Sequence, residues 1–596
     1  MIHVDSQQPQ LAEADGRAPL TMPAGLQPRE TLRRRRTLVV PLNLASGLLL
    51  LVLTARVLGT GGWSPVDLGL LACCLFAVPW TVLGFWNAII GFWLLRRGRA
   101  GLAEAAPFHA SGDGAAPIRL ATAIVMTLRN EDPARALSRL ERVKASLDAT
   151  GRGAAFAYHV LSDTDDPGVA AAEEGAVAAW RDRTTPGERH RIAYRRRPAN
   201  TGFKAGNLQE FCRRCAGDYD LMVPLDADSL MDGACILRLV RIMQADPAIG
   251  ILQSLVVGSP ADSPFARIFQ FGMRQGMRPY TMGSAWWTGD CGPFWGHNAV
   301  VRIRPFADHC RMPDLPDGLL GGAILSHDQI EAVLMRRAGY EVRVLPMEGG
   351  SFEDNPPTLI DHVTRELRWC FGNMQYLRLL QLPGLHPVSR FQLAAAILMF
   401  LTAPALTLAL VLVPLKLTEL EETFPAGLAA GLYLTWLVAS VAPKLAGYLD
   451  ILASRSDRKA YGGTATFLSG AALELVFSFL LLSVSTFRLT IFLVRRLGRS
   501  SGSWNRQNRD AHGLSLDSAT RGLWDCFAFG AVLCAVIAWL SPAALAWCLP
   551  LMLGYLLCIP FAVITASPRL GRVMIRLRLC ATPEEIDRSP ERDVRS

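Results

Sequence analysis

The sequence is poor in charged residues for its length. Asp, Glu, Lys and Arg make up 19% of its 596 residues, whereas they make up about 25% of a typical soluble domain. Its 13 cysteines are scattered, and the C-x-x-C of Cys212 and Cys215 has no second pair at the spacing of a zinc site. The phosphate-binding motif G-x-x-x-x-G-K-[ST] is also missing. These features exclude a disordered chain and a small disulfide-rich domain, and they argue against transport driven by ATP.

Long uncharged runs account for the low charge and predict membrane-spanning helices. A helix that crosses about 30 Å of hydrocarbon needs about 20 apolar residues. The segment 526–568 lacks charge throughout and predicts two spans with a break near Ser541. The segment 464–494 is apolar but contains Glu474, which we expect to face the interior of the bundle. It predicts one span, a tight hairpin, or a span with an interfacial helix. The remaining runs are 38–55, 68–95, 391–415 and 424–443.

Basic residues at the ends of these runs predict the orientation in the membrane. Arg33–Arg36 precede the first run, and Arg96 and Arg97 follow the second, so both flanks are expected in the cytoplasm. Basic residues after 494 and after 568 place those segments there too. An even number of spans is then required, and a hairpin at 464–494 gives about eight. The late first run argues against a cleaved signal peptide. Because the flanks explain the positive net charge, nucleic acid is not expected as a partner.

The segment between the second and third runs has a different pattern. Short β-rich runs alternate with helical stretches, which predicts a parallel α/β sheet. Ligands of such sheets bind beyond the carboxyl ends of the strands. The expected strands are 121–128, 155–161, 191–194, 221–225, 249–257 and 341–345. The expected order is a tail (1–37), two spans (38–95), the α/β domain (116–362), an interfacial helix (363–385), spans (391–494), a basic loop (495–520), two spans (523–568) and a tail (569–596).

Two carboxylates directly follow the apolar run 221–225. Asp226 and Asp228 are two residues apart, and alternate residues of a strand face the same side. Mg²⁺ typically takes one or two carboxylates together with phosphate oxygens of a substrate. Aspartates also favour turns after strands, so this D-x-D predicts a metal site only together with other motifs.

Further polar motifs lie at the ends of other predicted elements. Lys204 lies in a glycine-containing turn before a helical stretch, an arrangement suited to a phosphate. Asp328 opens a helix, either as an N-cap or as a carboxylate that can take a proton. Arg365-Glu366-Leu367-Arg368-Trp369 begins an amphipathic stretch before a span, which is typical of an interfacial helix.

Two further segments are candidates for contacts with substrate. An aromatic-rich segment leads into Trp295, His297 and Asn298, which we expect at an acceptor site. Core packing explains the tryptophans equally well, and His297 fits a structural role equally well. The basic, glycine-bearing loop 499–509 is either a lid over a nucleotide or an ordinary flank. Its candidate residues are Arg499, Trp504 and Arg506.

In this order, the motifs resemble those of the processive family 2 glycosyltransferases, which include cellulose and hyaluronan synthases. The match covers roughly 121–369 and the flanking spans. The resemblance implies a GT-A-type domain inserted into a helical membrane bundle. It also implies that Asp328 is the catalytic base and that Asp226 and Asp228 bind Mg²⁺ or Mn²⁺. The resemblance further implies that Asp163 and Lys204 bind the nucleotide and that Arg368 and Trp369 belong to the site. From their positions in the sequence, Thr127, Arg129 and Glu131 are expected to line the nucleotide pocket, with Arg368 at the phosphates. The expected acceptor-binding residues are Trp369, Trp295, His297 and Asn298.

The sequence departs from the best-known members in ways that bear on the product. Ser326 and His327 stand where the family has Thr and Glu, and Arg365 stands where cellulose synthases have Gln, which leaves cellulose and hyaluronan in doubt. The two early spans, the R-E-L-R-W form and the segment 498–507 are more similar to bacterial synthases of osmoregulated periplasmic glucans. That resemblance implies an inner-membrane enzyme with UDP-glucose as donor, a growing β-1,2-glucan as product and acyl carrier protein as a partner.

One base without an evident nucleophile favours a single displacement with inversion, hence a β-linkage from an α-linked donor. A hydrophilic glucan does not cross hydrocarbon unaided, so export through the spans is expected. Two alternatives remain: a lipid-linked or other polysaccharide glycosyltransferase, which shares the D-x-D, and a transporter with a nucleotide-binding domain.

Overall fold

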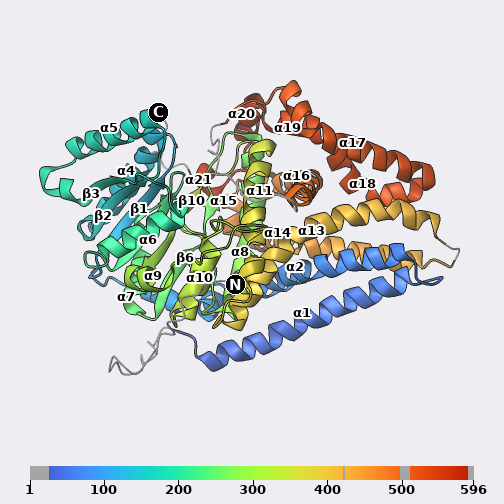
Figure 1. Cartoon of the computed structure of the whole chain (residues 1–596), viewed down its shortest axis with the longest axis horizontal. Coiled ribbons are helices and arrows are strands. Elements are labelled where there is room, and N and C mark those ends of the chain that lie inside the picture. The colour runs from blue at the N-terminus through green and yellow to red at the C-terminus, as the bar shows by residue number, and fades with distance from the viewer. Residues whose placement is uncertain (1–25, 421–422, 497–510, 588–596) are drawn as a thin grey trace.

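An α/β domain and a bundle of long helices lie beside each other in the computed structural model of the protein (Figure 1). The structure describes residues 26–420, 423–496 and 511–587. Helices α1 (Arg29–Leu58) and α2 (Pro65–Arg96) precede the α/β domain, and the remaining bundle helices follow it. The domain is therefore inserted into the bundle, which confirms the predicted fold class.

Seven strands form the main sheet, in the order β3-β2-β1-β4-β8-β6-β9. The pairs β1–β2, β2–β3, β1–β4 and β6–β9 are parallel, but β8 is antiparallel to β4 and β6. The expectation of a wholly parallel sheet is therefore wrong at β8, a strand too short to stand out as a β-rich run. The strands are β1 (Thr122–Leu128), β2 (Phe156–Ser162), β3 (Ile192–Arg196), β4 (Leu221–Asp226), β6 (Ile249–Ser254), β8 (Ala299–Arg302) and β9 (Glu341–Leu345).

Helices cover both faces of this sheet because its strands are apolar on both sides. Ile124 and Met126 of β1 pack in one hydrophobic cluster, whereas Ala123 and Val125 pack in the other. This alternation follows from the strand period of two. One face is covered by α4 (Pro133–Ala149), α5 (Pro167–Arg183) and α7 (Gly233–Ala245), and the other by α6 (Phe203–Cys215), α9 (Ile303–His309) and α10 (Asp328–Arg337).

A second, three-stranded sheet has the order β5-β10-β7. It consists of β5 (Leu230–Met231), β10 (Ser351–Glu353) and β7 (Val257–Gly258). Strands of two or three residues carry too little periodicity to be recognised in a sequence. This small sheet nevertheless connects the end of β4 to the segment before α11 (Leu359–Met374).

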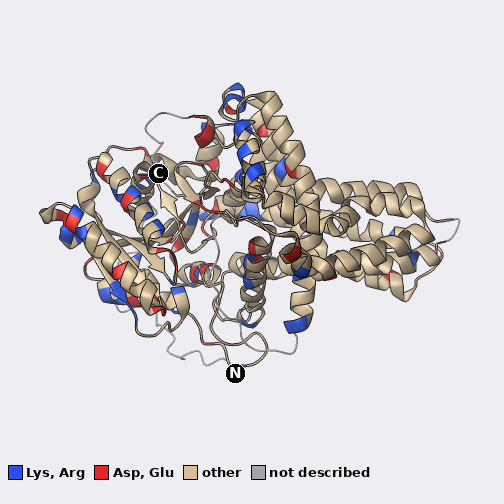
Figure 2. Cartoon of the chain, turned by 90° about the horizontal axis from the view of Figure 1, so that it is seen from above, with Lys and Arg blue, Asp and Glu red and all other residues tan. Residues whose placement is uncertain are grey.

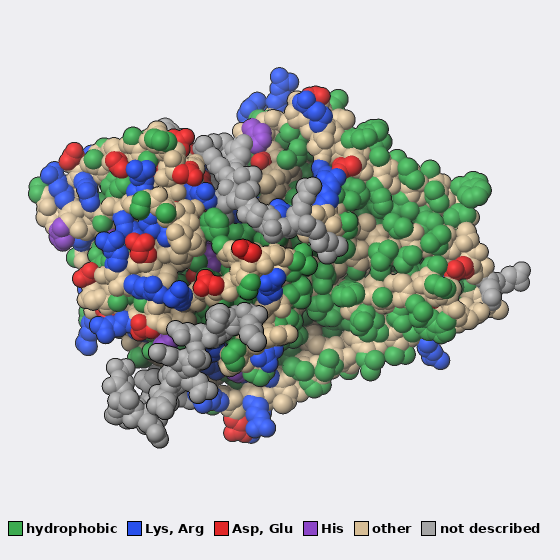
Figure 3. All heavy atoms as spheres, in the orientation of Figure 1, with side chains coloured by type: hydrophobic (Ala, Val, Ile, Leu, Met, Phe, Trp, Pro, Cys, Tyr) green, Lys and Arg blue, Asp and Glu red, His purple; other side chains and the backbone are tan. Residues whose placement is uncertain are grey.

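The bundle has the dimensions and surface of a membrane domain. Six described helices are long and apolar enough to cross a membrane, and the pair α18–α19 is bent by 56°. The visible surface of the bundle is mostly hydrophobic (Figure 3). Charged residues gather on the α/β domain and where this domain meets the bundle (Figure 2). The later helices are α13 (Pro387–Thr418), α14 (Ala426–Ala453), α16 (Thr464–Arg496), α17 (Leu516–Leu540), α18 (Pro542–Leu556) and α19 (Cys558–Thr565).

The expected hairpin at 464–494 is wrong, because α16 is a single helix of 33 residues. It is seen nearly end-on in Figure 1, whereas α1, α2, α13 and α14 run across the view. Near its beginning Phe467 packs on Phe271 of α8 (Pro264–Thr288), and near its end the Arg496 guanidinium lies 5.5 Å from the Phe371 ring of α11. Both ends of α16 thus lie beside the α/β domain. The described helices give six candidate spans, or seven with the bent pair, instead of the eight that the sequence predicted. The basic segments at the two ends of α16 can therefore lie on the same side of the membrane without a hairpin.

Helix α8 fastens the α/β domain to the bundle through close backbone contacts. A Cβ atom on Gly283 would stand 2.0 Å from the Asn87 carbonyl oxygen of α2, and one on Gly91 would stand 1.8 Å from the Pro279 carbonyl oxygen of α8. Only glycine permits helices to approach so closely. The α/β domain and the bundle are therefore joined by the close packing of α8 on α2 as well as by their connection along the chain.

A buried polar cluster lies where α14, α16 and α8 meet. Glu474 is 1% exposed, and it accepts hydrogen bonds from Lys444, Tyr448 and Ser478. A Cβ atom on Gly272 of α8 would collide with its carboxylate. Glu474 therefore faces the interior, as its charge predicted.

Candidate active site

The carboxyl ends of β1, β2 and β4 lie at one edge of the main sheet. The register pairs Thr127 with Asp226 across β1 and β4, and Leu128 with Ser162 across β1 and β2. Thr127 donates a hydrogen bond to the Leu225 carbonyl oxygen at 3.4 Å. Residues that directly follow these strands therefore start from neighbouring positions, although they are far apart in the sequence.

The D-x-D segment forms a tight turn at this edge. The hydroxyl of Ser229 accepts the Asp226 N–H at 3.0 Å, and the Ser229 N–H donates to the Asp226 carbonyl oxygen at 3.0 Å. The Asp228 carbonyl oxygen accepts a hydrogen bond from Arg139 of α4. Lys204 forms a close ion pair with the Asp226 carboxylate. The turn thus carries two carboxylates, and hydrogen bonds to its backbone fix its shape.

Lys204 reaches Asp226 from the first turn of α6. This helix begins at Phe203, directly after Gly202, which adopts a left-handed conformation with φ of 69°. The lysine lies inside the helix, rather than in a turn before it as the sequence suggested. The positive end of the helix dipole and the ammonium group consequently lie on the same side of the site.

Asp328 lies beside this pair although more than a hundred residues separate it from Lys204. The position that a Cβ atom would take on Gly296 is 3.3 Å from the Asp328 Cβ, 3.5 Å from the His327 Cε1 and 3.8 Å from the Lys204 Nζ. Gly296 has φ of +80°, a conformation that L side chains rarely adopt. Asp328 is the first residue of α10, and His327 holds the N-cap position. The N-cap alternative for Asp328 is therefore wrong.

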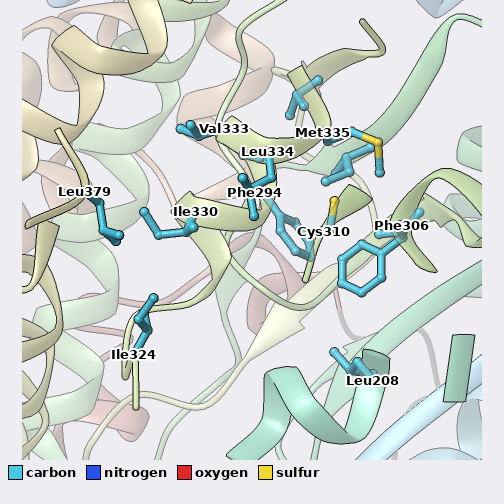
Figure 4. Close-up of a cluster of buried hydrophobic side chains, with 14 of the residues drawn as sticks. Leu208, Phe294, Phe306, Cys310, Ile324, Ile330, Val333, Leu334, Met335 and Leu379 are labelled. Carbon is cyan, nitrogen blue, oxygen red and sulfur yellow. The ribbon is translucent and has the colours of Figure 1, made fainter. Parts of the chain in front are cut away.

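The core beneath Asp328 fixes the direction of α10. Ile330, Val333 and Leu334 of this helix are at most 2% exposed. They point into a cluster with Phe294, Phe306 and other apolar side chains (Figure 4). Because the apolar stripe is buried, the polar start of the helix is held at the site.

Helix α11 brings the R-E-L-R-W residues to the same region. Burial and the charge of Arg365 lower the pKa of Arg368 to about 10, while Asp226 and Glu131 act in the opposite direction. Arg368 is therefore within electrostatic reach of the D-x-D turn. The Arg365 guanidinium lies 4.6 Å from the Trp369 ring centre, and Trp369 is 43% exposed. An arginine stacked on an aromatic ring in this way stabilises its position.

His297 lies behind the D-x-D turn. Its Nε2 is 3.3 Å from the Glu353 carboxylate, and its Nδ1 is 3.3 Å from the Ser229 hydroxyl. Burial alone would lower the pKa of His297, but the hydrogen bond to Glu353 and the charges of Asp226 and Glu353 raise it above its usual value.

The other two predicted acceptor residues differ in exposure. Asn298 is 0% exposed and donates hydrogen bonds to the Ser351 hydroxyl and the Phe352 carbonyl oxygen, both at 3.0 Å. A contact between Asn298 and an acceptor would require these bonds to break. Trp295 is half-buried, and its backbone N–H donates to Gln253.

Asp163 is paired by an arginine that the motif analysis missed. Arg197 donates to both carboxylate oxygens of Asp163, at 2.7 and 2.8 Å, and both side chains are 6% exposed. The run of arginines from Arg195 to Arg197, at the end of β3, was the available signal. Arg129 lies 3.5 Å from Asp165 and 6.0 Å from the Phe203 ring centre, so it borders the same strand ends.

The predicted metal ligands fit a cation only together with a nucleotide. Within the described residues, no group of three or more His, Cys, Asp and Glu side chains is arranged to hold a metal ion. Asp226 and Asp228 supply hard oxygen ligands on one turn, as Mg²⁺ and Mn²⁺ require, and Mg²⁺ commonly completes its shell with substrate phosphates and water. The proposed loop residues Arg499, Trp504 and Arg506 lie outside the described residues.

A pocket of about 300 Å³ lies elsewhere, between α8, α15 (Arg455–Ala460) and the C-terminal segment. It is lined by Arg274, Arg278, Glu348 and Glu584. Arg274 pairs with Glu348 and Glu584, and Arg278 pairs with Asp450. The charged side chains that line this pocket are therefore engaged in ion pairs.

Comparisons with known proteins find similarity to glycosyltransferases. Residues 124–310 match the model "Glycosyl transferase family 2", and residues 221–438 match "Glycosyl transferase family group 2". The chain is 37% identical over 544 residues to Glucans biosynthesis glucosyltransferase H of Pseudomonas aeruginosa, which covers 88% of this chain and 62% of that protein. The protein of the same name from Pseudomonas putida is 36% identical over 539 residues, covering 87% and 61%. The chain thus spans about three fifths of the length of these relatives.

Among solved structures, the chain matches a mannosyltransferase from Pyrobaculum calidifontis in complex with GDP-Man and Mn²⁺. The TM-score is 0.38 and the identity is 16%, and the match covers 63% of this chain and 98% of that chain.

Proposed function

We propose that the chain is an inverting, processive glucosyltransferase that builds a β-1,2-linked glucan from UDP-glucose. The premise is the match of residues 124–310 to the model "Glycosyl transferase family 2". The sequence similarity to the two glucosyltransferases supports the sugar and the product. The observation that carries the chemistry is the position of Asp328 beside Lys204 and Asp226 around Gly296. A base and a site for a diphosphate then lie next to each other.

The proposed reaction is one in-line displacement at the anomeric carbon. The Asp328 carboxylate takes the proton of the acceptor hydroxyl, whose oxygen forms the new bond to that carbon. The bond between the carbon and the diphosphate oxygen breaks, and the diphosphate leaves with the electron pair. Attack from the opposite face inverts the configuration, so an α-linked donor gives a β-linked product. Positioned proton transfer contributes about 10²–10⁴-fold to rates.

Lys204 and Arg368 are placed to stabilise the charge that develops on the diphosphate. Lys204 provides a compact charge beside Asp226, and the planar guanidinium of Arg368 binds phosphate oxygens through two donors. A divalent cation held by Asp226 and Asp228 would supply further charge stabilisation when bound. Trp369 offers an exposed ring to the acceptor sugar.

The bundle supports a location in a bacterial inner membrane with the α/β domain in the cytoplasm. Arg33 to Arg36 lie near the start of α1, on the domain side, and Arg36 donates to the Thr288 carbonyl oxygen of α8. With α16 across the bundle, the remaining long helices and the bent α18–α19 pair return the chain to the domain side. Basic flanks favour the cytoplasm. Export of the glucan through this bundle is part of the proposal; acyl carrier protein is not.

Purified protein incubated with radiolabelled UDP-glucose tests the activity. We expect a polymer whose methylation analysis gives 1,2-linked glucose, and we expect EDTA to stop its formation and Mg²⁺ or Mn²⁺ to restore it. A single sugar attached to a lipid would instead support a lipid-linked transferase. In sealed vesicles with donor outside and the α/β domain facing out, export predicts that product accumulates inside.

The role of the base is tested by Asp328→Asn. We expect a fall in rate of about 10²–10⁴-fold with an unchanged unfolding temperature. Asp308→Asn, which changes an exposed aspartate at the end of α9, is the matched control and should retain full activity. A rate for Asp328→Asn near that of the unmodified protein would refute the assignment.

A further inference from the structure

Two consecutive carboxylates at the end of β10 reach the D-x-D turn from behind. β10 pairs with β5, which directly follows the turn, so that Phe352 stands opposite Leu230. Glu353 and Asp354 come next in the chain. Because consecutive residues of an extended chain point to opposite sides, the two carboxylates approach different parts of the turn.

Glu353 acts on the beginning of the turn through two side chains, those of His297 and Ser229. Its carboxylate lies 3.3 Å from His297 Nε2, and His297 Nδ1 lies 3.3 Å from the Ser229 hydroxyl. That hydroxyl accepts the backbone N–H of Asp226 at 3.0 Å. Glu353 also holds its own strand, because its carbonyl oxygen accepts the Ser259 N–H at 2.7 Å. The chain of contacts runs from β10 to the backbone N–H of Asp226, the first residue of the D-x-D.

Asp354 acts on the end of the turn through an arginine. Its carboxylate accepts hydrogen bonds from Arg135 and Arg139 of α4, both at 2.7 Å. Arg139 donates at the same time to the Asp228 carbonyl oxygen. The side chains of Asp354 and Arg139 are 13% and 15% exposed, so solvent screens this pair little. The backbone of the second carboxylate is thereby fixed.

The geometry points to Glu353 and Asp354 as positioning residues that hold the 226–229 turn in the shape that receives a divalent cation with a nucleoside diphosphate. The inference rests on the proposed function, since it concerns the same donor site. Both residues act on the turn through other side chains. The role follows from the contacts that Glu353 and Asp354 make with the two ends of the turn. Without these contacts, a cation bound to the two aspartates would distort the turn.

Binding of Mn²⁺ measured by electron paramagnetic resonance, with and without UDP, tests the inference independently of catalysis. Loss of a residue that orients metal ligands typically lowers metal affinity about 10–100-fold, and we expect this loss in Glu353→Gln and in Asp354→Asn. We also expect KM for UDP-glucose to rise more than kcat falls. Asp354→Glu, which keeps the charge near Arg139, should recover part of the affinity.

Glu341→Gln is the matched control. It removes a carboxylate of similar exposure that pairs with Arg343 at 2.7 Å on β9, and it should leave Mn²⁺ affinity unchanged. Should Asp354→Asn fail to fold, Arg139→Lys tests the same link while keeping the positive charge. Unchanged Mn²⁺ affinity in the folded Glu353 and Asp354 variants, or no Mn²⁺ binding by the unmodified protein, would overturn the inference. Mn²⁺ binding that weakens in these variants, in a protein that transfers no glucose, would overturn the proposed function and leave the inference standing.

Discussion

A cluster of charged side chains at the strand ends of the α/β domain can be compared with another in the bundle. In each, a lysine forms a close ion pair with a carboxylate: Lys204 with Asp226, and Lys444 with Glu474. The difference lies in what surrounds the carboxylate. Asp226 is 31% exposed, whereas Glu474 is 1% exposed and is also bonded by Tyr448 and Ser478.

This difference indicates that the Asp226 carboxylate is placed to bind a ligand, whereas the Glu474 carboxylate is placed to stabilise the packing of the bundle. The Glu474 carboxylate is satisfied by three protein donors and lies against backbone at Gly272. Its interactions therefore stabilise the folded state, because a buried charge that loses its partner is strongly destabilising. At the strand ends, Asp226 and Asp228 keep part of their surface in solvent. Changes there should affect the reaction and spare the fold.

The largest expected effect is the loss of both D-x-D carboxylates. Asp226→Asn with Asp228→Asn should lower the rate of glucose transfer by about 10³-fold or more, since groups that stabilise developing charge each contribute about 10²–10³-fold. The unfolding temperature should change little, because Asp226 is partly exposed and such ion pairs contribute little. Initial rates and thermal unfolding of the same preparation measure both. A stable but fully active variant would contradict the comparison.

The bundle cluster should give the opposite result. Lys444→Met leaves Glu474 buried beside an apolar group and should lower the free energy of unfolding by about 3–5 kcal/mol. The transfer rate per folded molecule should stay the same. Unfolding in detergent, followed by tryptophan fluorescence, measures the loss. Lys459→Met, which changes an exposed lysine of α15, is the control, and equal stabilities of the two variants would show that the pair is unimportant.

A smaller effect is expected where the two regions join. Gly283→Ala places a Cβ atom 2.0 Å from the Asn87 carbonyl oxygen, so α8 must move away from α2, at a typical cost of about 1–3 kcal/mol for overpacking. Gly276→Ala on the same helix meets its nearest atom at 3.6 Å. It should be neutral or stabilising, because alanine favours helices more than glycine does. Thermal unfolding distinguishes them, and equal values would argue against the close crossing.

The smallest effect is a pH dependence behind the site. The pKa of His297 is raised above 6.5 in the folded protein, so the folded state binds this proton more tightly than the unfolded state. The stabilisation is complete below pH 6.5 and disappears as the pH rises through the folded pKa. Unfolding temperatures at several pH values should show Glu353→Gln less stable than the unmodified protein on the acidic side, with the difference narrowing as the pH rises through the folded pKa of His297. A constant gap would contradict a charged His297.

The sequence predicted the elements with strong local patterns. β9 has the predicted bounds of 341–345, and the uncharged runs became long helices. Hydropathy did not predict the direction of a helix: α16, with a mean hydropathy of 2.0, equals α17 in this respect, but only α16 lies across the bundle. An apolar surface is satisfied equally by lipid and by neighbouring helices, so its composition does not distinguish them.

At the site, the motifs identified carboxylates and cations but not their partners. Asp163 was expected at the nucleotide, and the structure pairs it with Arg197. Asn298 was expected at the acceptor, and it is buried against Ser351. Glu353 and Asp354 had no recognisable motif, since their role depends on a pairing between two very short strands.

The sequence by itself determined that this protein has an inserted α/β domain in a membrane bundle and that polar groups follow its strands, because hydropathy, strand period and motif order are local properties of the chain. Only the tertiary structure decided which polar groups meet. Gly296 brings Asp328 beside Lys204, and α16 turns across the bundle. Such contacts join residues far apart in sequence, and they depend on the packing of side chains from several elements at once.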